Sequence, residues 1–193
     1  MKNICVFCGS SSGTDPIYSE TARLLGRQFV QHNIRLIFGA GKVGLMGVIA
    51  DTVLDCGGEA VGVIPDFLWE KEVGHTELTE LHVVESMHLR KQKMAELADG
   101  FIAMPGGFGT LEEVAEILTW VQLALIRKPV GILNVNGFYN PLLKQLDQMV
   151  NHGFLKVQNR QLIIEITTTE RAVDRLRDFE FDDFSIWDKL EKT

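Results

Sequence analysis

The sequence contains few cysteines, and their spacing argues against a metal or redox site. There are three in 193 residues: Cys5, Cys8 and Cys56. Cys5 and Cys8 have C-x-x-C spacing, but the sequence has no second pair to complete a zinc site. Cys5 falls within the first predicted strand and Cys8 directly follows it, and residues three apart along a strand point to opposite faces. We therefore predict three buried, reduced thiols and no metal site.

The chain also lacks a basic run, and its formal net charge is −7. Nucleic acid is therefore not an expected partner, although a small anionic ligand needs only a local basic pocket. No apolar run is long enough to span a bilayer, so no membrane partner is expected either. The N-terminus enters a strand at once, without the layout of a signal peptide. These absences predict a cytoplasmic protein.

What the sequence does contain is a regular alternation of short apolar strands and amphipathic helices. The predicted strands cover residues 4–7, 36–38, 60–64, 81–84, 101–104, 130–133 and 162–166. The predicted helices cover residues 16–32, 45–54, 87–98, 110–126, 139–151 and 168–179. Such alternation implies a parallel sheet covered on both faces. We predict a three-layer, doubly wound α/β fold with a Rossmann-like, mostly parallel sheet. A single domain would cover residues 1–179, followed by a C-terminal tail over residues 180–193.

Four segments lie at predicted strand ends, where sheets of this kind bind their ligands. These sheets place ligands at the carboxyl ends of the strands. The segments are Gly9–Ser12, Gly39–Gly47, Ser86–Lys91 and Pro105–Glu113. We expect them to meet along one edge of the sheet.

The segment Gly39–Gly47 contains G-x-G-x-x-G between a strand and a helix, the pattern of a dinucleotide site. That site also requires an acid at the end of the next strand. Glu59 lies at the start of the predicted strand, and Asp66 lies beyond its end. The pattern therefore favours a tight turn with close helix packing, and some contact to a phosphate or sugar, over a nicotinamide or flavin site.

The segment Pro105–Glu113 joins a strand to a helix through three glycines. Such a loop lets the backbone approach a ligand, and the helix that follows offers unpaired N–H groups to a phosphate. Thr110 and Glu113 also match a capping box, in which Glu113 accepts the N–H of Thr110 and Glu112 is a solvated acid. Capping does not require the Pro-Gly-Gly-x-Gly lead-in. We therefore favour phosphate binding combined with chemistry that needs a carboxylate.

The segment Ser86–Lys93 places two cations at the start of a helix. With Ser86 as the N-cap, Arg90 and Lys91 fall near the first turn. Cations there face the positive end of the helix dipole, at a cost of about 0.3–1 kcal/mol each. A solvated basic face explains Lys93 better than Arg90, because Arg90 shares a helical face with apolar residues. The pattern favours a ligand role for Arg90 and also for Lys91.

These segments together resemble the LOG ("lonely guy") family of cytokinin-activating phosphoribohydrolases, whose bacterial members carry the older label "lysine decarboxylase-like". The family motif Pro-Gly-Gly-x-Gly-Thr-x-x-Glu is matched by Pro105, Gly106, Gly107, Gly109, Thr110 and Glu113. The preceding Met-His-x-Arg-Lys block is matched by Met87, His88, Arg90 and Lys91. Gly44–Gly47 and Pro129–Asn134 are also similar to family segments. Ala40 departs from the pattern, since many members have a third consecutive glycine there.

The resemblance implies a single nucleotide-binding domain that hydrolyses the N-glycosidic bond of adenosine 5′-monophosphate, often N6-prenylated, to free base and ribose 5-phosphate. It implies that Arg90 and Glu113 are the catalytic pair and that no cofactor is needed. The implied nucleotide-binding positions are Glu72, Arg90, Lys91, Gly107, Phe108, Gly109, Thr110, Leu111, Glu112, Glu113 and Thr119. It further implies a homodimer with its active site near the interface.

The residues suit this chemistry. Glycosidic cleavage passes through an oxocarbenium-like sugar, which Glu113 can stabilise while it holds a ribose hydroxyl or orients water. Arg90 stays protonated, so its expected role is to hold the nucleotide and stabilise charge on the departing side. The 5′-phosphate is expected on the backbone of Gly107, Gly109 and Thr110, with help from Ser10. Glu72 is expected to touch the base or sugar, although a charged loop of this kind is also compatible with plain solvation.

Two other functions compete with this hypothesis. A pyridoxal-dependent lysine decarboxylase needs a Schiff-base lysine and a dedicated cofactor site, and no lysine stands out for that role. A non-catalytic nucleotide or molybdenum-cofactor carrier shares the fold class and the glycine-rich edge. The pair of Arg90 and Glu113 separates the hydrolase from the carrier, because a pure binder does not need a carboxylate beside a phosphate. The preferred base and the physiological role stay open.

Overall fold

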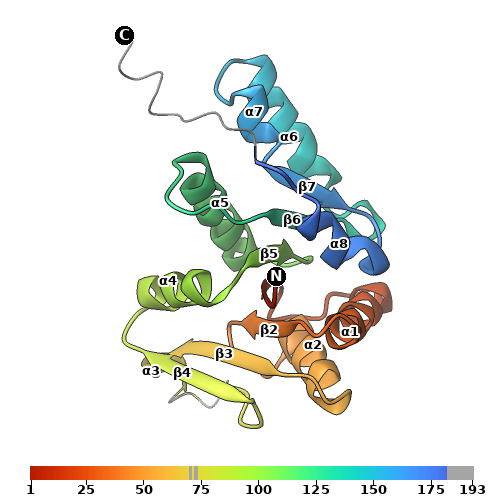
Figure 1. The fold of residues 1–193 in the computed structure, drawn as a ribbon, viewed down its shortest axis with the longest axis vertical. Coiled ribbons are helices and arrows are strands. Elements are labelled where there is room, and N and C mark those ends of the chain that lie inside the picture. Colours follow the sequence, from red (N-terminus) through yellow and green to blue (C-terminus); the bar gives the residue numbers. More distant parts are fainter. Residues whose placement is uncertain (70, 72–73, 182–193) are drawn as a thin grey trace.

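The computed structural model describes residues 1–69, 71 and 74–181, which form one seven-stranded sheet with helices on both faces (Figure 1). Its strands are β1 (Asn3–Phe7), β2 (Arg35–Phe38), β3 (Ala60–Pro65), β4 (Glu80–Val84), β5 (Gly100–Ala103), β6 (Val130–Leu133) and β7 (Ile163–Ile166). They run in the order β4-β3-β2-β1-β5-β6-β7, and every neighbouring pair is parallel. The predicted parallel α/β fold is confirmed.

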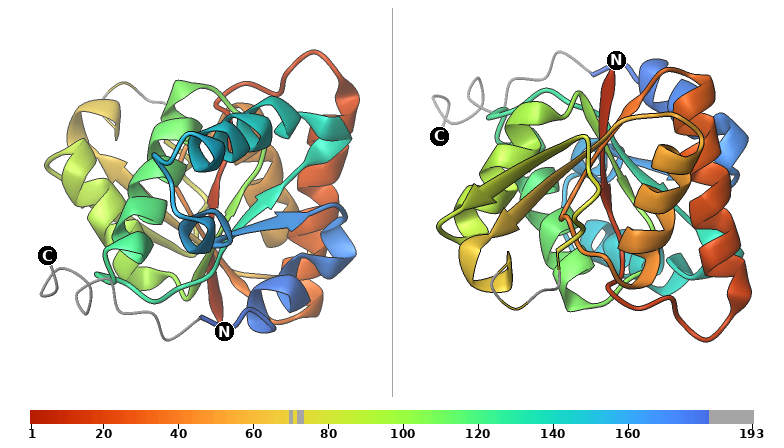
Figure 2. Two further views of the ribbon diagram at one scale, coloured as in Figure 1. Left: turned by 90° about the horizontal axis from the view of Figure 1, so that it is seen from above. Right: turned by 90° about the horizontal axis from the view of Figure 1, so that it is seen from below.

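The helices divide between the two faces of the sheet, as Figure 2 shows from both ends. The longer ones are α1 (Pro16–Gln31), α2 (Gly44–Asp55), α4 (Met87–Leu97), α5 (Phe108–Gln122) and α6 (Asn140–Asn151). The shorter ones are α3 (Asp66–Trp69), α7 (Val157–Arg160), α8 (Ala172–Arg177) and the 3-10 turns η1 (Val135–Gly137) and η2 (Thr169–Arg171). One hydrophobic core lies under α1, α2 and α8, and a second lies under α4, α5 and α6.

Alternate residues of β1 enter different cores, because successive side chains of a strand point to opposite faces. Ile4 and Val6 join the core under α1 and α2, while Cys5 and Phe7 join the other. Cys8, just beyond the strand, lies in the first core, so the prediction that Cys5 and Cys8 face opposite ways is confirmed.

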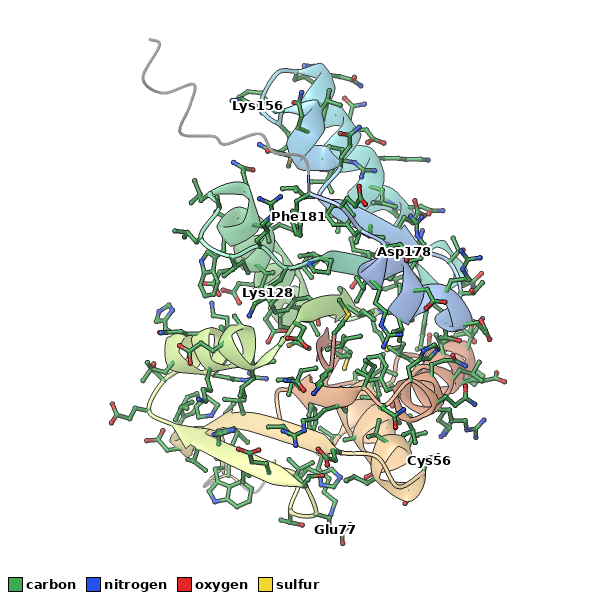
Figure 3. All side chains as sticks on the ribbon, in the orientation of Figure 1. Cys56, Glu77, Lys128, Lys156, Asp178 and Phe181 are labelled. Atoms are coloured by element: carbon green, nitrogen blue, oxygen red, sulfur yellow. The ribbon has the colours of Figure 1, made fainter. Side chains whose placement is uncertain are left out.

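The prediction of three buried thiols is wrong for Cys56. Cys5 and Cys8 are buried, but Cys56 is exposed, and all three are free. Cys56 is the C-cap residue of α2, at the turn that leads from this helix into β3 (Figure 3). A helix end of this kind lies at the surface whatever the residue type.

The strand order places a crevice at the carboxyl end of β1. This strand pairs with β2 on one side and β5 on the other, so the connections on its two sides lead in opposite directions. Ligands of open α/β sheets bind at such a switch point. Gly9, just after β1, donates its N–H to the Pro105 carbonyl at 3.0 Å and accepts the N–H of Leu45 at 3.0 Å. It thereby joins three of the four predicted segments.

Two helix starts test the sequence predictions. Ser86 caps α4 as predicted, since its hydroxyl accepts the N–H of Leu89 at 3.2 Å. Helix α5 begins at Phe108 with Gly107 as its N-cap, so Thr110 already lies inside the helix. The capping-box interpretation of Thr110 and Glu113 is therefore wrong, and it leaves Glu113 free for another role.

The remaining differences lie near the C-terminal half and in the long connection. Helices α3 and α7 were not predicted, and the predicted helix over residues 168–179 is divided into η2 and α8. Most of the predicted tail, residues 182–193, lies outside the described residues. No helix in the described part of the chain is long and apolar enough to cross a membrane.

Candidate active site

A cavity of about 540 Å³ opens at the carboxyl ends of β1, β2, β3 and β5. Its lining comes from all four predicted segments, from β1 and β3, and from helices α3 and α4. The lining residues are Val6, Phe7, Cys8, Gly9, Ser10, Gly39, Gly41, Val43, Met46, Ile64, Leu68, Arg90, Met94, Gly107, Phe108, Gly109, Thr110 and Glu113. The expectation that the four segments meet along one edge is confirmed.

Arg90 lies against the first glycine of the G-x-G-x-x-G pattern. Its Nη2 donates to the Gly39 carbonyl at 3.3 Å, and a Cβ on Gly39 would lie 1.6 Å from that nitrogen. The guanidinium therefore occupies the space that a side chain at position 39 would need. Arg90 is 8% exposed, and its Nε has no hydrogen-bond partner among the described residues. A buried donor without a partner is available to a ligand.

Glu113 faces Arg90 from the second turn of α5. Its Oε1 lies 3.9 Å from Arg90 Nη2, and the two side chains are 11% and 10% exposed. Burial raises the pKa of Glu113 to about 7, although the Arg90 charge lowers it. The site thus combines a permanent cation with a carboxyl group that titrates near neutral pH. Such a pKa suits a group that changes protonation during a reaction.

The glycine loop leaves open space on its cavity side. A Cβ on Gly107 or Gly109 would meet no atom within 4 Å, whereas one on Gly106 would lie 2.1 Å from the Thr110 hydroxyl. Gly106 is therefore needed for packing, and Gly107 and Gly109 border the space a ligand would fill. Residues 107–110, at the N-terminus of the 15-residue helix α5, line the cavity. A helix N-terminus of this kind suits a phosphate.

The second glycine segment is explained by packing, as the turn interpretation predicted. Gly44 has φ +65°, and a Cβ there would lie 2.2 Å from the Ser10 backbone. Ala40 also has a left-handed φ of +57°, a conformation that favours glycine. The N–H of His75 donates to the Ala40 carbonyl at 2.8 Å and supports this turn. Gly39, Gly41, Val43 and Met46 line the cavity, and the contact of this segment with a phosphate or sugar stays a prediction.

Sequence reasoning missed the support that the long connection gives to the site. Leu68 of α3 lines the cavity, and the buried His75 holds the returning chain. The His75 Nε2 lies 2.8 Å from Asp51 Oδ1, and its Nδ1 accepts the N–H of Glu77 at 3.2 Å. No pattern in the charged segment 65–80 signals these contacts.

Several predicted binding residues lie away from the cavity. Lys91 forms ion pairs with Glu112 and Glu116. Neither Lys91 nor Glu112 is among the residues that line the cavity. Thr119 is exposed, and its hydroxyl donates to the Ala115 carbonyl at 2.7 Å. Leu111 is 38% exposed and also outside the lining, while Glu72 lies outside the described residues. Ser10, Gly107, Phe108, Gly109 and Thr110 do line the cavity with Arg90 and Glu113.

The described lining of the cavity contains neither a set of metal-ligating side chains nor a lysine that could form a Schiff base. The described residues contain no group of three or more His, Cys, Asp or Glu side chains that could hold a metal ion. No lysine is among the described residues that line the cavity. Burial raises the pKa of the Cys8 thiol, and the Glu113 charge adds to that effect, so Cys8 is neutral.

Comparison with known proteins gives consistent relatives over nearly the whole chain. A family model described as possible lysine decarboxylase matches residues 46–176. The cytokinin riboside 5′-monophosphate phosphoribohydrolase LOG7 of Arabidopsis thaliana is 44% identical over 196 residues, 99% of this chain and 90% of that protein. The phosphoribohydrolase LOG of Oryza sativa subsp. japonica is 43% identical over 189 residues, 97% of this chain and 78% of that protein.

Solved structures add the fold. The molybdenum cofactor carrier protein from Chlamydomonas reinhardtii has a TM-score of 0.69 and 21% sequence identity, and the likeness covers 92% of this chain and 99% of that one. At this identity the likeness shows the arrangement of strands and helices, and says nothing about a ligand.

The raised pKa of Glu113 predicts how the substitution Glu113→Gln changes the pH dependence of stability. The folded state holds the proton up to about pH 7, above the ordinary value of 4.5. Its stabilising effect is therefore complete below pH 4.5 and is lost as the pH rises through 7. Between pH 5 and pH 8, the free energy of unfolding of the unsubstituted protein should fall by about 2–3 kcal/mol relative to Glu113→Gln.

Urea unfolding of both proteins at the two pH values measures this difference. Glu96→Gln on the exposed face of α4 is the matched control, and it should follow the unsubstituted protein. Equal pH dependence of Glu113→Gln and the unsubstituted protein would contradict a raised pKa at Glu113.

Proposed function

Because the chain belongs to the LOG family of cytokinin riboside 5′-monophosphate phosphoribohydrolases, we propose that it hydrolyses an adenosine 5′-monophosphate, plain or N6-substituted, to free base and ribose 5-phosphate. The observation that carries the proposal is the buried pair of Arg90 and Glu113 beside the N-terminus of α5. This pair places a cation and a titratable carboxyl group in the same cavity as the glycine loop, where we expect the phosphate to bind.

The phosphate end of the substrate lies at the glycine loop. The open space beside Gly107 and Gly109, and the helix N-terminus that follows, supports this position. Thr110 and Ser10 also line the cavity and add hydroxyl groups. With the 5′-phosphate held there, the ribose extends toward Glu113.

The reaction breaks the bond between C1′ and the base nitrogen, and water supplies the new oxygen on C1′. Positive charge develops on the ribose in the transition state, so the ionised form of Glu113 stabilises it and orients the water. The base departs with the electron pair of the broken bond and takes up one proton, which balances the proton that the attacking water loses as its oxygen bonds to C1′. Arg90 stays a cation throughout and stabilises negative charge on the departing base. Since the carboxylate is the active form, kcat/KM rises with pH through the pKa of Glu113.

A non-catalytic carrier is the second candidate function, and the site argues against it. Burying a carboxyl group that must ionise near neutral pH is costly, and it gives no advantage to a protein that only binds phosphate. The solved carrier structure shares the fold at 21% identity, and a likeness at that level says nothing about a ligand. The hydrolase relatives at 43–44% identity favour the enzyme.

We also propose a single nucleotide-binding domain that acts as a homodimer in the cytoplasm. Apolar side chains at the start of α5 and on α4 support the dimer, because they lie exposed near the cavity. Phe108 is 92% exposed, and Leu89, Leu111 and Met87 are 37–42% exposed. Exposed apolar side chains, when they gather on one surface, are typical of a region that another protein covers. In sedimentation equilibrium the species should have twice the 21.6 kDa mass of one chain, and a purely monomeric species contradicts the proposal.

Substitution of the catalytic pair tests the proposed reaction. Glu113→Gln and Arg90→Ala should each lower kcat/KM at least about a hundredfold, because each removes a charge that acts on the transition state. Chromatography of free base and ribose 5-phosphate, released from AMP and from N6-prenylated AMP, measures the rate.

Matched controls keep this test specific. Lys93→Ala and Glu96→Gln change the same charge types on the outer side of α4 and should retain full activity. Near-normal release of base by folded Glu113→Gln and Arg90→Ala would contradict the assignment. Nucleotide binding without any release by the unsubstituted protein would favour the carrier.

A further inference from the structure

His75 is a buried histidine whose ring connects its own segment to helix α2. Its side chain is 2% exposed, and its Nδ1 accepts the N–H of Glu77 at 3.2 Å. Because Nδ1 accepts, the ring proton lies on Nε2, which donates to Asp51 Oδ1 of α2 at 2.8 Å. The Asp51 side chain is 59% exposed, so this hydrogen bond rather than burial fixes its carboxylate. The ring therefore ties residues 75–77 to α2.

The backbone of the same segment holds the turn that follows β2. The His75 N–H donates to the Ala40 carbonyl at 2.8 Å, and Gly74 forms an antiparallel bridge with Gly41. This turn needs support, because Ala40 has a φ of +57°, a left-handed conformation that is unfavourable for a residue with a side chain. Such a conformation persists only where the surrounding contacts impose it. By fixing residues 74–77, the hydrogen bond between Asp51 and His75 also fixes this turn.

The turn in its place holds the guanidinium of Arg90. The Gly39 carbonyl, one residue before that of Ala40, accepts a hydrogen bond from Arg90 Nη2 at 3.3 Å. The same Nη2 lies 3.9 Å from Glu113 Oε1, which is beyond hydrogen-bond distance. Opposite charges in a buried site attract each other and would close to about 2.8 Å if nothing restrained them. The Gly39 carbonyl is therefore the group that keeps Arg90 from closing on Glu113.

We propose that Asp51 and His75 are positioning residues of the hydrolase, which fix the turn at residues 39–41 and so hold Arg90 at a distance from Glu113. This role rests on the proposed hydrolysis. While the two charged groups are held apart, Arg90 faces the departing base and Glu113 faces the ribose. If they closed into an ion pair, their charges would neutralise each other, and neither would act fully on the transition state.

The pKa of Glu113 reports the distance between these two charged groups. Burial raises that pKa to about 7, and a closer guanidinium would lower it. The Cys5 and Cys8 thiols also face Glu113, and burial raises the pKa of each, so both are neutral. Neither Asp51 nor His75 acts directly on the pKa of Glu113. The charged groups that do act on it are Arg90 and Lys91 of α4 and Glu112 and Glu116 of α5.

The substitution Asp51→Ala tests this role through the titration of Glu113 and the kinetics of base release. It removes the acceptor of the His75 Nε2–H, so the turn relaxes and Arg90 closes on Glu113. The NMR midpoint of the Glu113 carboxyl group and the apparent pKa of kcat/KM should both fall by at least about one unit from 7. The kcat for AMP should fall at least about fivefold above pH 8, where Glu113 is ionised in both proteins, because Arg90 no longer faces the departing base.

Two control variants separate the position of Arg90 from the charge of Asp51. Asp51→Asn removes the same negative charge but keeps an oxygen that accepts the His75 Nε2–H, so it should retain the midpoint and the kcat of the unsubstituted protein. Asp55→Ala, at an exposed position one turn further along α2, should retain both as well. Equal effects of Asp51→Ala and Asp51→Asn overturn the proposal, and so does a Glu113 midpoint that does not fall in Asp51→Ala.

The titration of Glu113 keeps the proposal separate from protein folding and from the proposed reaction. A merely structural role of Asp51 would lower the melting temperature and leave the Glu113 midpoint where it is. If Asp51→Ala does not fold, Asp51→Glu replaces it, since this exposed position accommodates one more methylene while the carboxylate is displaced from His75. Its midpoint should fall too, and an unchanged midpoint overturns the proposal.

If the unsubstituted protein releases no base, the titration of Glu113 decides alone. A lower midpoint in Asp51→Ala than in Asp51→Asn then supports the positioning of Arg90 while the proposed reaction fails. Equal midpoints in the two variants overturn the positioning role, whether or not the protein is a hydrolase.

Discussion

The structure depends on one electrostatic contact, the buried approach of the Glu113 carboxyl group to the Arg90 guanidinium. Neither group could be buried alone without a large cost, and at 3.9 Å they compensate each other only in part. The remaining cost is visible in the raised pKa of Glu113. Groups whose pKa is shifted by burial in this way gather at functional sites, where stability is lower than packing alone would allow.

Much of the surrounding architecture accommodates this contact. Gly39 lacks a side chain where the guanidinium lies, and the left-handed Ala40 lets the chain turn away beneath it. Gly9 links the ends of β1 and β5 to the start of α2. On the other side, Lys91 connects α4 to α5. The parallel sheet brings these parts together because each of them follows the carboxyl end of a strand.

The sequence predicts the fold well because the evidence for it is local and repeated. Each strand is a short apolar run, and each large helix has a regular apolar face, so errors are confined to element ends and to short helices such as α7. The site is predicted less completely. The start of α5 depends on how Gly106 packs against Gly9 and Thr110, and a local capping pattern gave the wrong answer. The direction of Lys91 and the burial of His75 depend on residues distant in the sequence.

The central claim is that Glu113 is a buried carboxyl group that ionises near neutral pH beside Arg90. A carbon-13 NMR titration of the glutamate side-chain carboxyl groups tests it most directly, with the Glu113 resonance identified by its absence in Glu113→Gln. The account predicts a midpoint near 7. A midpoint at the ordinary value of 4.5 would contradict it, because Glu113 would then behave as a solvated surface carboxylate.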